Sequence, residues 1–250
     1  MNLRRLTLIA AGIVIIWQVV VWLTGVPPYI LPGPLRVARA AAIHWESLIT
    51  HALTTLAEII VGLLVGTALG TISALGMIAS RSLKRWLLPV LVISQAIPVF
   101  TLAPLLVIWL GYGMGSKVAM AVLIIYFPVT AAFFDGLRST EPEWLELTNV
   151  MNASPLAVIK HIRIPAALPS FASGLRVATA VAPIGAVVGE WVGSSQGLGF
   201  YMLHANARMQ IDAMFAALAV LAVLALGLYF AIDKIMTKMI YWQKIEEEEE

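Results

Sequence analysis

Six apolar runs, each long enough to cross a lipid bilayer, dominate the sequence. A helix needs roughly 20 apolar residues to span the hydrocarbon core, where it satisfies its own backbone hydrogen bonds. Only 12% of the residues are charged, against about a quarter in soluble domains, so a globule could not bury this apolar surface. The sequence therefore predicts an all-α polytopic membrane protein with one transmembrane domain, residues 1–250. Its six transmembrane helices are predicted at residues 6–24, 53–79, 86–110, 118–134, 171–188 and 213–232.

The composition excludes several kinds of catalytic and binding site. The chain has no cysteine, which excludes disulfides, thiolate catalysis and cysteine-containing metal sites. No nucleotide-binding GxxxxGK[ST] motif occurs, and the glycine-rich residues 111–117 are predicted to form a turn. Neither a Ser-His-Asp arrangement nor a carboxylate pair points to a catalytic centre, so we expect no enzyme activity and no bound cofactor. The histidines lie on different segments, which predicts no metal site: His44, His51, His161 and His204.

The distribution of basic residues predicts the orientation in the membrane. Residues 1–24 could be a signal peptide, but no small-residue cleavage site precedes Pro27, so we interpret them as a retained first span. With the N-terminus in the cytoplasm, the inner segments collect about three times as many Lys and Arg residues as the outer ones, as the positive-inside rule requires. Both termini are then cytoplasmic. The outer basic residues are Arg36, Arg39, Lys117 and Arg208; the inner ones are Arg4, Arg5, Arg81, Lys84, Arg85, Arg138, Lys160, Arg163, Lys234, Lys238 and Lys244.

Segments outside and within the second span also have expected structures. Prolines predict an extended outer segment at 27–34, followed by a short interfacial helix over 35–49. Three glycines at helical spacing, Gly62, Gly66 and Gly70, would let another helix approach closely, although glycine is also simply common in membrane helices. The Glu246–Glu250 run is interpreted as a solvated tail. Basic residues flank the spans and form no nucleic-acid-binding surface.

A polar stretch, residues 135–165, forms the longest predicted cytoplasmic loop. Thr140 is expected to cap a helix, with Glu143 closing a capping box, and the helix should end near Asn152, a residue that tolerates the left-handed conformation. Ser154 and Pro155 then start a second short helix with Leu156 and Ile159 on one face, and 162–165 closes the unit. Two stiff helices with fixed ends could transmit a displacement; an ordinary helical loop is the alternative.

Polar residues within the spans are candidates for a translocation pathway. Proline breaks in a membrane helix are tolerated where neighbouring helices or a water-lined cavity satisfy the freed carbonyl groups. Helix packing explains the same residues nearly as well. Glu190 has a gating or a structural role at the outer end, and Glu58 either lies on the pathway or reaches water near the outer interface. The pathway candidates are Ser94, Gln95, Pro98, Thr101, Tyr126, Thr130 and Glu190.

The cytoplasmic loop resembles the EAA loop of ABC-importer permeases. Glu146, the six-residue spacing to Asn152, Ile162 and Pro165 match that motif, whereas Leu147-Thr148 replaces its Ala-Ala pair and Asn152 its glycine. Further segments, such as 30–34, 97–111 and 190–199, are similar to permeases of the sulfonate, taurine, nitrate and bicarbonate group. Residues 189–222 are most similar to permeases that import a thiamine pyrimidine precursor.

This resemblance implies a permease subunit in the bacterial inner membrane. It implies a second permease copy in a homodimer, a cytoplasmic ATPase dimer that binds ATP and Mg²⁺, and an extracytoplasmic substrate-binding protein, besides contact with lipid. A thiamine pyrimidine precursor is the expected solute; a sulfonate, taurine or nitrate importer and an ion-coupled secondary transporter are the alternatives. The 154–161 helix would be the coupling helix. The residues implied to contact the ATPase are Glu146, Asn152, Ala153, Ser154, Pro155, Leu156, Ile159, Lys160, Ile162 and Pro165.

Overall fold

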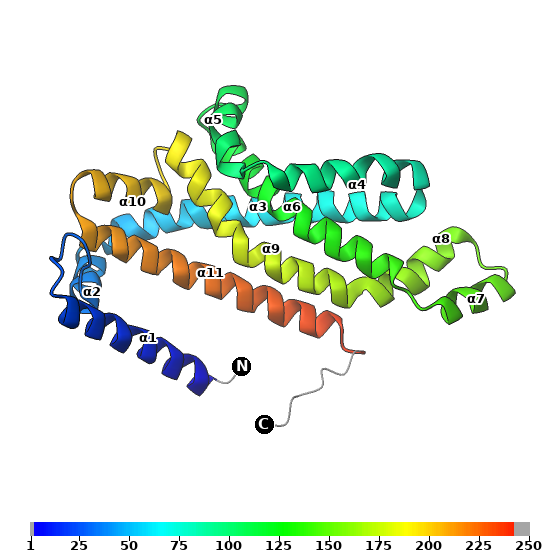
Figure 1. The fold of residues 1–250 in the computed structure, drawn as a ribbon, viewed down its shortest axis with the longest axis horizontal. Helices are drawn as coiled ribbons and strands as arrows, with labels where there is room; N and C mark the ends of the chain where they lie inside the picture. Colours follow the sequence, from blue (N-terminus) through cyan, green and yellow to red (C-terminus); the bar gives the residue numbers. More distant parts are fainter. Residues whose placement is uncertain (1–2, 243–250) are drawn as a thin grey trace.

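The fold is entirely helical in the computed structural model, which describes residues 3–242. No strand occurs in that range, so the predicted all-α class is confirmed. The predicted solvated tail at Glu246–Glu250 and the inner-side Lys244 lie outside the described residues. The molecule is elongated, and its long helices run roughly along the longest axis (Figure 1).

Within residues 3–242, five helices are long and apolar enough to span a membrane, and one bent pair of helices would make a sixth span. The five are α1 (Leu3–Thr24), α3 (Trp45–Ala79), α6 (Met114–Arg138), α9 (Ile164–Gly193) and α11 (Ile211–Met239). The third predicted span, 86–110, is not one straight helix but α4 (Arg81–Ala96) and α5 (Val99–Leu110), which meet at 104°. The bend lies at Pro98, which lacks an amide hydrogen and holds the preceding Ile97 in an extended conformation.

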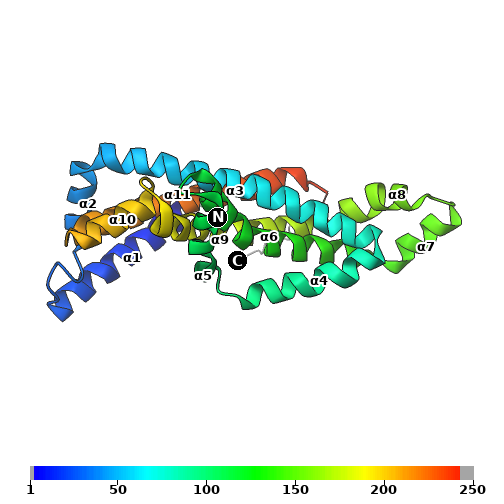
Figure 2. The same cartoon turned by 90° about the horizontal axis from the view of Figure 1, so that it is seen from above.

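The remaining helices lie at the two ends of the molecule. Figures 1 and 2 place α2 (Pro34–Ile43) and α10 (Leu198–Ala207) at one end. They place α7 (Pro142–Val150), α8 (Pro155–Val158) and the π-helical turn η1 (Ile159–Arg163) at the other. The predicted helix over 35–49 is wrong, because the chain turns at His44 and the long α3 begins at Trp45.

The core is the packing of α6 between α3 and α9. A Cβ atom added at Gly62 would lie 2.6 Å from Ala121 Cβ, and one added at Gly66 would lie 2.7 Å from Ile125 Cγ2. Gly70 faces Thr130 in the same way. The prediction that these glycines admit a neighbouring helix is therefore confirmed, since each one faces α6 where side chains would collide.

Two parts of the molecule expose most of their apolar surface. Helix α1 contacts the rest mainly through α2 and through Trp17, whose ring lies 6.0 Å from that of Phe215. The α4–α5 pair leaves Ile93, Phe100 and Trp109 more than 60% exposed. Apolar surface of this extent marks contact with lipid or with another protein.

Candidate functional site

The loop between α6 and α9 forms the end of the molecule opposite α2 and α10 (Figure 1). Its first helix, α7, begins at Pro142 after Glu141, without a side-chain cap. The predicted capping box is wrong, because Thr140 is buried and its hydroxyl donates to the Leu137 carbonyl, 3.3 Å away, at the end of α6. Proline in the first turn, which loses no intrahelical hydrogen bond, is enough to start α7.

The end of α7 follows the sequence prediction. Asn152 has φ of +50°, and its amide donates to the Asn149 carbonyl at 3.0 Å. The amide of Ala153 donates to the Thr148 carbonyl at 3.0 Å. These two bonds are the Schellman pattern, in which a left-handed residue closes a helix. Asn152 therefore replaces the glycine of the resembling motif at small conformational cost.

The second helix begins as predicted but does not end. The Ala157 amide donates to Ser154 Oγ at 3.3 Å, and Pro155 occupies the first helical position. The predicted closure at 162–165 is wrong, since α8 continues through η1 into α9. In η1 the Ile164 amide donates to the carbonyl of Ile159, one residue further back than in an α-helix. This wider π turn lies directly before Pro165 and lets the helix continue past it.

The loop exposes apolar side chains on its outer surface. Leu156 is 74% exposed and Val150 is 80% exposed. Of the pair that departs from the resembling motif, Leu147 points outward, whereas Thr148 is buried. Arg163 holds the loop against the bundle by donating to the Leu137 carbonyl at 3.1 Å. The residues implied to contact an ATPase are thus exposed, except for the half-buried Ile159, Ile162 and Pro165.

The predicted pathway residues fall into three places. Ser94, Gln95, Pro98 and Thr101 lie together at the exposed α4–α5 bend, where Ser94 accepts a hydrogen bond from Gln95 at 3.3 Å. Tyr126 hydrogen-bonds Ser73 of α3 across 2.8 Å. Thr130 does not face a cavity: it is fully buried against Gly70, with its hydroxyl on the Tyr126 carbonyl. The bend is thus the only one of these places where the predicted polar residues share an open surface.

Glu190 belongs to a buried hydrogen-bond network at the other end of the molecule. This network, which we call the outer cap, satisfies the first amides of α10. Glu190 Oε2 accepts from the amides of Gly199 and Phe200, while Oε1 accepts from the Thr55 hydroxyl at 2.6 Å. Thr55 Oγ1 in turn accepts from the Leu198 amide at 2.8 Å. Carboxylates at a helix N-terminus gain both from the hydrogen bonds and from the helix dipole. With 1% exposure, Glu190 lines no open pathway.

His51 completes the outer cap. Its Nδ1 accepts a hydrogen bond from the amide of Gly197 at 3.0 Å. The N-cap residue of α10 makes no side-chain hydrogen bond of its own, so residues of α3 and α9 satisfy the first amides of this helix instead. Gly197 has φ of +107°, and an added Cβ would collide with the Glu190 carboxyl group. The sequence analysis missed Thr55 and His51. Their signal is that His51, Thr55 and Glu58 follow one another at helical spacing on one face of a largely apolar helix.

Glu58 is part of a buried ion pair near the outer cap. Its Oε1 lies 3.5 Å from Lys117 Nζ, and both side chains are less than 10% exposed. The expectation that Glu58 reaches water is wrong, because Glu58 is 1% exposed and its partner Lys117, in the first turn of α6, lies buried against Gly189 of α9. The predicted turn at 111–117 covers only 111–113, after which α6 begins. Within residues 3–242 no group of three metal-ligating side chains occurs.

Comparison with known proteins identifies relatives along the whole chain. Residues 62–240 match the family described as binding-protein-dependent transport system inner membrane component. A probable ABC transporter permease protein of Haemophilus influenzae is 56% identical, covering 96% of this chain and 98% of the relative. The formylaminopyrimidine transport permease protein ThiX of Halalkalibacterium halodurans is 37% identical over 95% of each chain. A putative aliphatic sulfonates transport permease protein of Bacillus subtilis is 30% identical, covering 86% and 79%.

A solved structure shares the fold. An inward-facing structure of the MetNI methionine ABC transporter superposes with a TM-score of 0.68 at 19% identity, covering 78% of this chain and 97% of the other. At this identity the likeness concerns the arrangement of helices alone.

Proposed function

This chain belongs to the family of binding-protein-dependent transport system inner membrane components, and from that premise we propose how it moves its solute. It is a permease subunit of an ABC importer, and ATP hydrolysis belongs to a separate subunit. We propose that it carries a formylaminopyrimidine-like precursor inward by alternating access. A cytoplasmic ATPase dimer, which binds ATP and Mg²⁺, would act on the loop that contains α7 and α8.

The observation that carries the proposal is the continuous helix from the loop to the outer cap. Residues Pro155–Gly193 form one helical path of 39 residues, about 58 Å at 1.5 Å per residue. Its first turn is exposed at the loop, and Glu190 near its last turn holds α10. A displacement applied at Leu156 would therefore reach the outer cap along one helical path, which passes the π turn η1 and the prolines at 169 and 183.

The exposed surface of the loop has the composition of a protein–protein interface. Leu156, Val150 and Met151 each expose more than 70% of their side chain at the tip, beside the charged Glu146 and Lys160. Apolar groups surrounded by polar ones are typical of an interface with a protein groove. With the positive-inside orientation this end lies in the cytoplasm, together with both termini, and α2 and α10 lie outside.

The α4–α5 bend is the proposed lining of the pathway. Ser94, Gln95 and Thr101 are exposed there among apolar side chains. Polar groups on such a surface become useful where two subunits enclose a water-filled route. We propose that a second copy of this chain packs against α4 and α5, and that the bend of each copy faces the route between them.

The solute assignment rests on the relatives. The formylaminopyrimidine permease is 37% identical over 95% of this chain, whereas the sulfonate permease is 30% identical over 86%. A sulfonate is therefore the second candidate. Family membership favours ATP-driven over ion-coupled transport. Uptake of labelled formylaminopyrimidine and of labelled alkanesulfonate, compared between cells with and without this chain, decides between the solutes. If the chain changes the uptake of neither compound, both assignments are wrong.

The coupling test uses two exposed apolar residues of the loop. Leu156→Glu places a charge on α8, whereas Val150→Glu places the same charge on α7. We expect Leu156→Glu to lower the solute-stimulated ATPase rate of the purified assembly about tenfold, since a central apolar contact contributes 2 kcal/mol or more. Val150→Glu should lower it less than about threefold. Equal and unchanged rates in both variants would contradict coupling through α8.

A further inference from the structure

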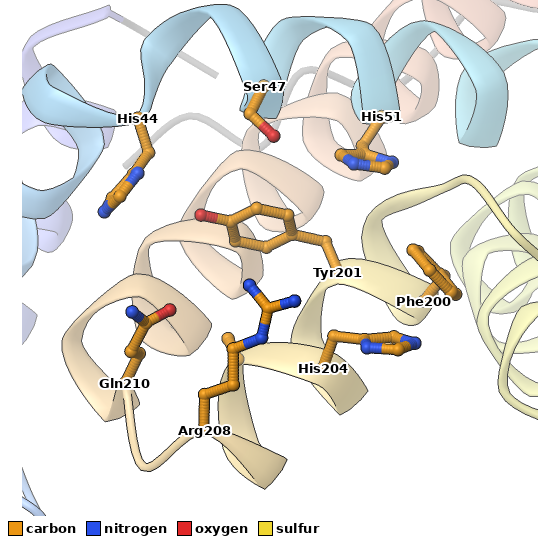
Figure 3. Close-up of a pocket in the computed structure, with 9 residues that line it drawn as sticks. His44, Ser47, His51, Phe200, Tyr201, His204, Arg208 and Gln210 are labelled. Carbon is orange, nitrogen blue, oxygen red and sulfur yellow. The ribbon is translucent and has the colours of Figure 1, made fainter.

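An open pocket of about 400 Å³ lies at the outer end, between α3 and α10 (Figure 3). We call it the outer pocket. Its walls come from the start of α3, from α10 and from the turn between α10 and α11. The residues that line it are His44, Ser47, His51, Phe200, Tyr201, His204, Ala205, Arg208 and Gln210. A space of this volume accommodates a polar side chain and part of its backbone.

The lining offers hydrogen-bond donors and no carboxylate. Figure 3 shows the Arg208 guanidinium beneath the Tyr201 ring, with Ser47 above that ring and Gln210 to the left of Arg208. No ion pair to Arg208 occurs within residues 3–242. Burial raises the pKa of the Tyr201 hydroxyl above its usual value, so this group stays a protonated donor at neutral pH. An unpaired guanidinium surrounded by hydroxyl, amide and imidazole groups matches an anion that accepts several hydrogen bonds.

The outer cap holds part of the lining in place. Because His51 Nδ1 accepts the Gly197 amide, the proton of the neutral imidazole resides on Nε2, the other ring nitrogen. The His51 ring lies 5.4 Å from that of Tyr201, and Phe200 lies 4.1 Å from His204. Side chains whose positions are set before binding lose little freedom on binding.

The turn that carries Arg208 and Gln210 adopts a costly conformation. Met209 has φ of +58°, in the left-handed region that glycine usually occupies. Its amide donates to the Asn206 carbonyl at 3.0 Å, and the Gln210 amide donates to the Ala205 carbonyl at 2.9 Å, which completes a Schellman turn. The turn fixes the backbone on both sides of Met209, and thereby places Arg208 and Gln210 on the pocket wall. Strain of this kind is retained where a particular arrangement is needed.

We propose that the outer pocket receives a carboxylate side chain of the extracytoplasmic binding protein, with Arg208 as its main partner. The inference rests on the proposed function, because a binding-protein-dependent importer takes its solute from such a protein, which would approach this end of the molecule in the proposed orientation. Arg208 supplies the complementary charge, the lining adds further donors and no carboxylate, and an acidic group entering it forms charge-assisted hydrogen bonds with a preformed site.

The first test measures docking in the reconstituted permease–ATPase assembly, using the binding protein that stimulates the wild-type ATPase. Arg208→Glu should raise the concentration of binding protein that gives half-maximal ATPase stimulation about tenfold. Arg208→Lys should raise it less than about threefold, because lysine keeps the charge. Arg36→Glu is the matched control, an identical charge reversal on exposed α2 outside the pocket, and should change it less than about twofold. Equal effects of the two reversals would overturn the proposal.

The second test separates a protein carboxylate from a small anion. The chain has no cysteine, so Ser47→Cys introduces one thiol into the pocket. Binding protein should slow maleimide labelling of this thiol about fivefold or more, whereas acetate or taurine alone at millimolar concentration should leave it unchanged. Protection by the small anion alone would make the pocket a solute site and overturn the docking proposal.

The two hypotheses fail in distinguishable ways. A wild-type assembly that no binding protein stimulates would refute the proposed function and, with it, the partner of the pocket. A wild-type assembly that is stimulated, together with an Arg208→Glu variant that responds at the same concentration, would refute the pocket alone.

Discussion

The two ends of the molecule, the α7–α8 end that we propose to be the inner one and the α10 end that we propose to be the outer one, begin their short helices by different means. At the inner end each short helix is closed by its own neighbours in sequence: Asn152 ends α7 and Ser154 caps α8. At the outer end the first amides of α10 are satisfied by Glu190 of α9 and by Thr55 and His51 of α3, the latter two more than 140 residues before the amides they cap. Because the short inner helices are capped by residues next to them in sequence, their outer surface is free for a partner. The structure at the outer end, in contrast, is stable only while α3, α9 and α10 remain packed together.

This difference has a mechanical consequence. Because α9 carries both the continuation of α8 and Glu190, a tilt of α9 relative to α3 would separate Glu190 from Thr55 and disturb the shared cap of α10. Amides without acceptors cost on the order of 1–3 kcal/mol each in a buried site. Such a motion would therefore cost free energy at the outer end of the bundle.

Removal of the Glu190 carboxylate is expected to have the largest effect. Glu190→Ala leaves the amides of Gly199 and Phe200 without their acceptor and leaves the Thr55 hydroxyl only the His51 carbonyl, so it should lower the free energy of unfolding by about 4 kcal/mol. Glu190→Gln keeps one acceptor oxygen and should cost about half of that. A denaturing-detergent titration of the purified protein measures both. Equal stability of wild type and Glu190→Ala would show that the outer cap contributes nothing.

A methyl group at Gly197 is expected to have the next largest effect. The residue has φ of +107° and its added Cβ meets the Glu190 carboxyl group, so Gly197→Ala should cost about 3 kcal/mol. Gly113→Ala is the matched control, because its φ is −81° and no atom lies within 4 Å of the added Cβ. We expect the control to change stability by less than about 0.5 kcal/mol in the same titration.

Loss of the local cap at the inner end should cost less. Ser154→Ala removes the acceptor of the Ala157 amide and should lower the free energy of unfolding by about 1 kcal/mol. Ser139→Ala removes a hydroxyl that only donates to the carbonyl of Gly136, and should change it by less than about 0.5 kcal/mol. If Ser154→Ala proved as costly as Glu190→Ala, the distinction between a local and a tertiary end would be lost.

The smallest expected effect compares the two left-handed helix ends. Met209→Gly relieves strain that asparagine at 152 largely avoids, but it also adds freedom to the unfolded chain. We expect a gain of about 0.5 kcal/mol for Met209→Gly and almost no change for Asn152→Gly, measured by the same titration. A larger gain at Asn152 would contradict the assignment of strain to the outer turn.

The sequence predicted what depends on neighbouring residues. The apolar runs identified the spans, although not the bend within 86–110, and the helix ends at Asn152 and Ser154 were both foreseen. The spans follow from a run of apolar residues as long as the bilayer is thick, and the helix ends from side chains and backbone conformations within about one helical turn. The prediction that Thr140 caps a helix was wrong, because its hydroxyl donates to the Leu137 carbonyl at the nearby end of α6.

Only the tertiary structure decided which distant groups meet. It paired Glu58 with Lys117, enclosed Glu190 with Thr55, and carried the helix past Pro165 into α9. These outcomes depend on which faces of α3, α6 and α9 pack together, and a membrane helix that is apolar on every side does not reveal its packing face through periodicity. The sequence by itself therefore determined the spans and the local caps, and close packing between helices determined the outer cap, because a buried polar group must find its partner wherever the packing places one.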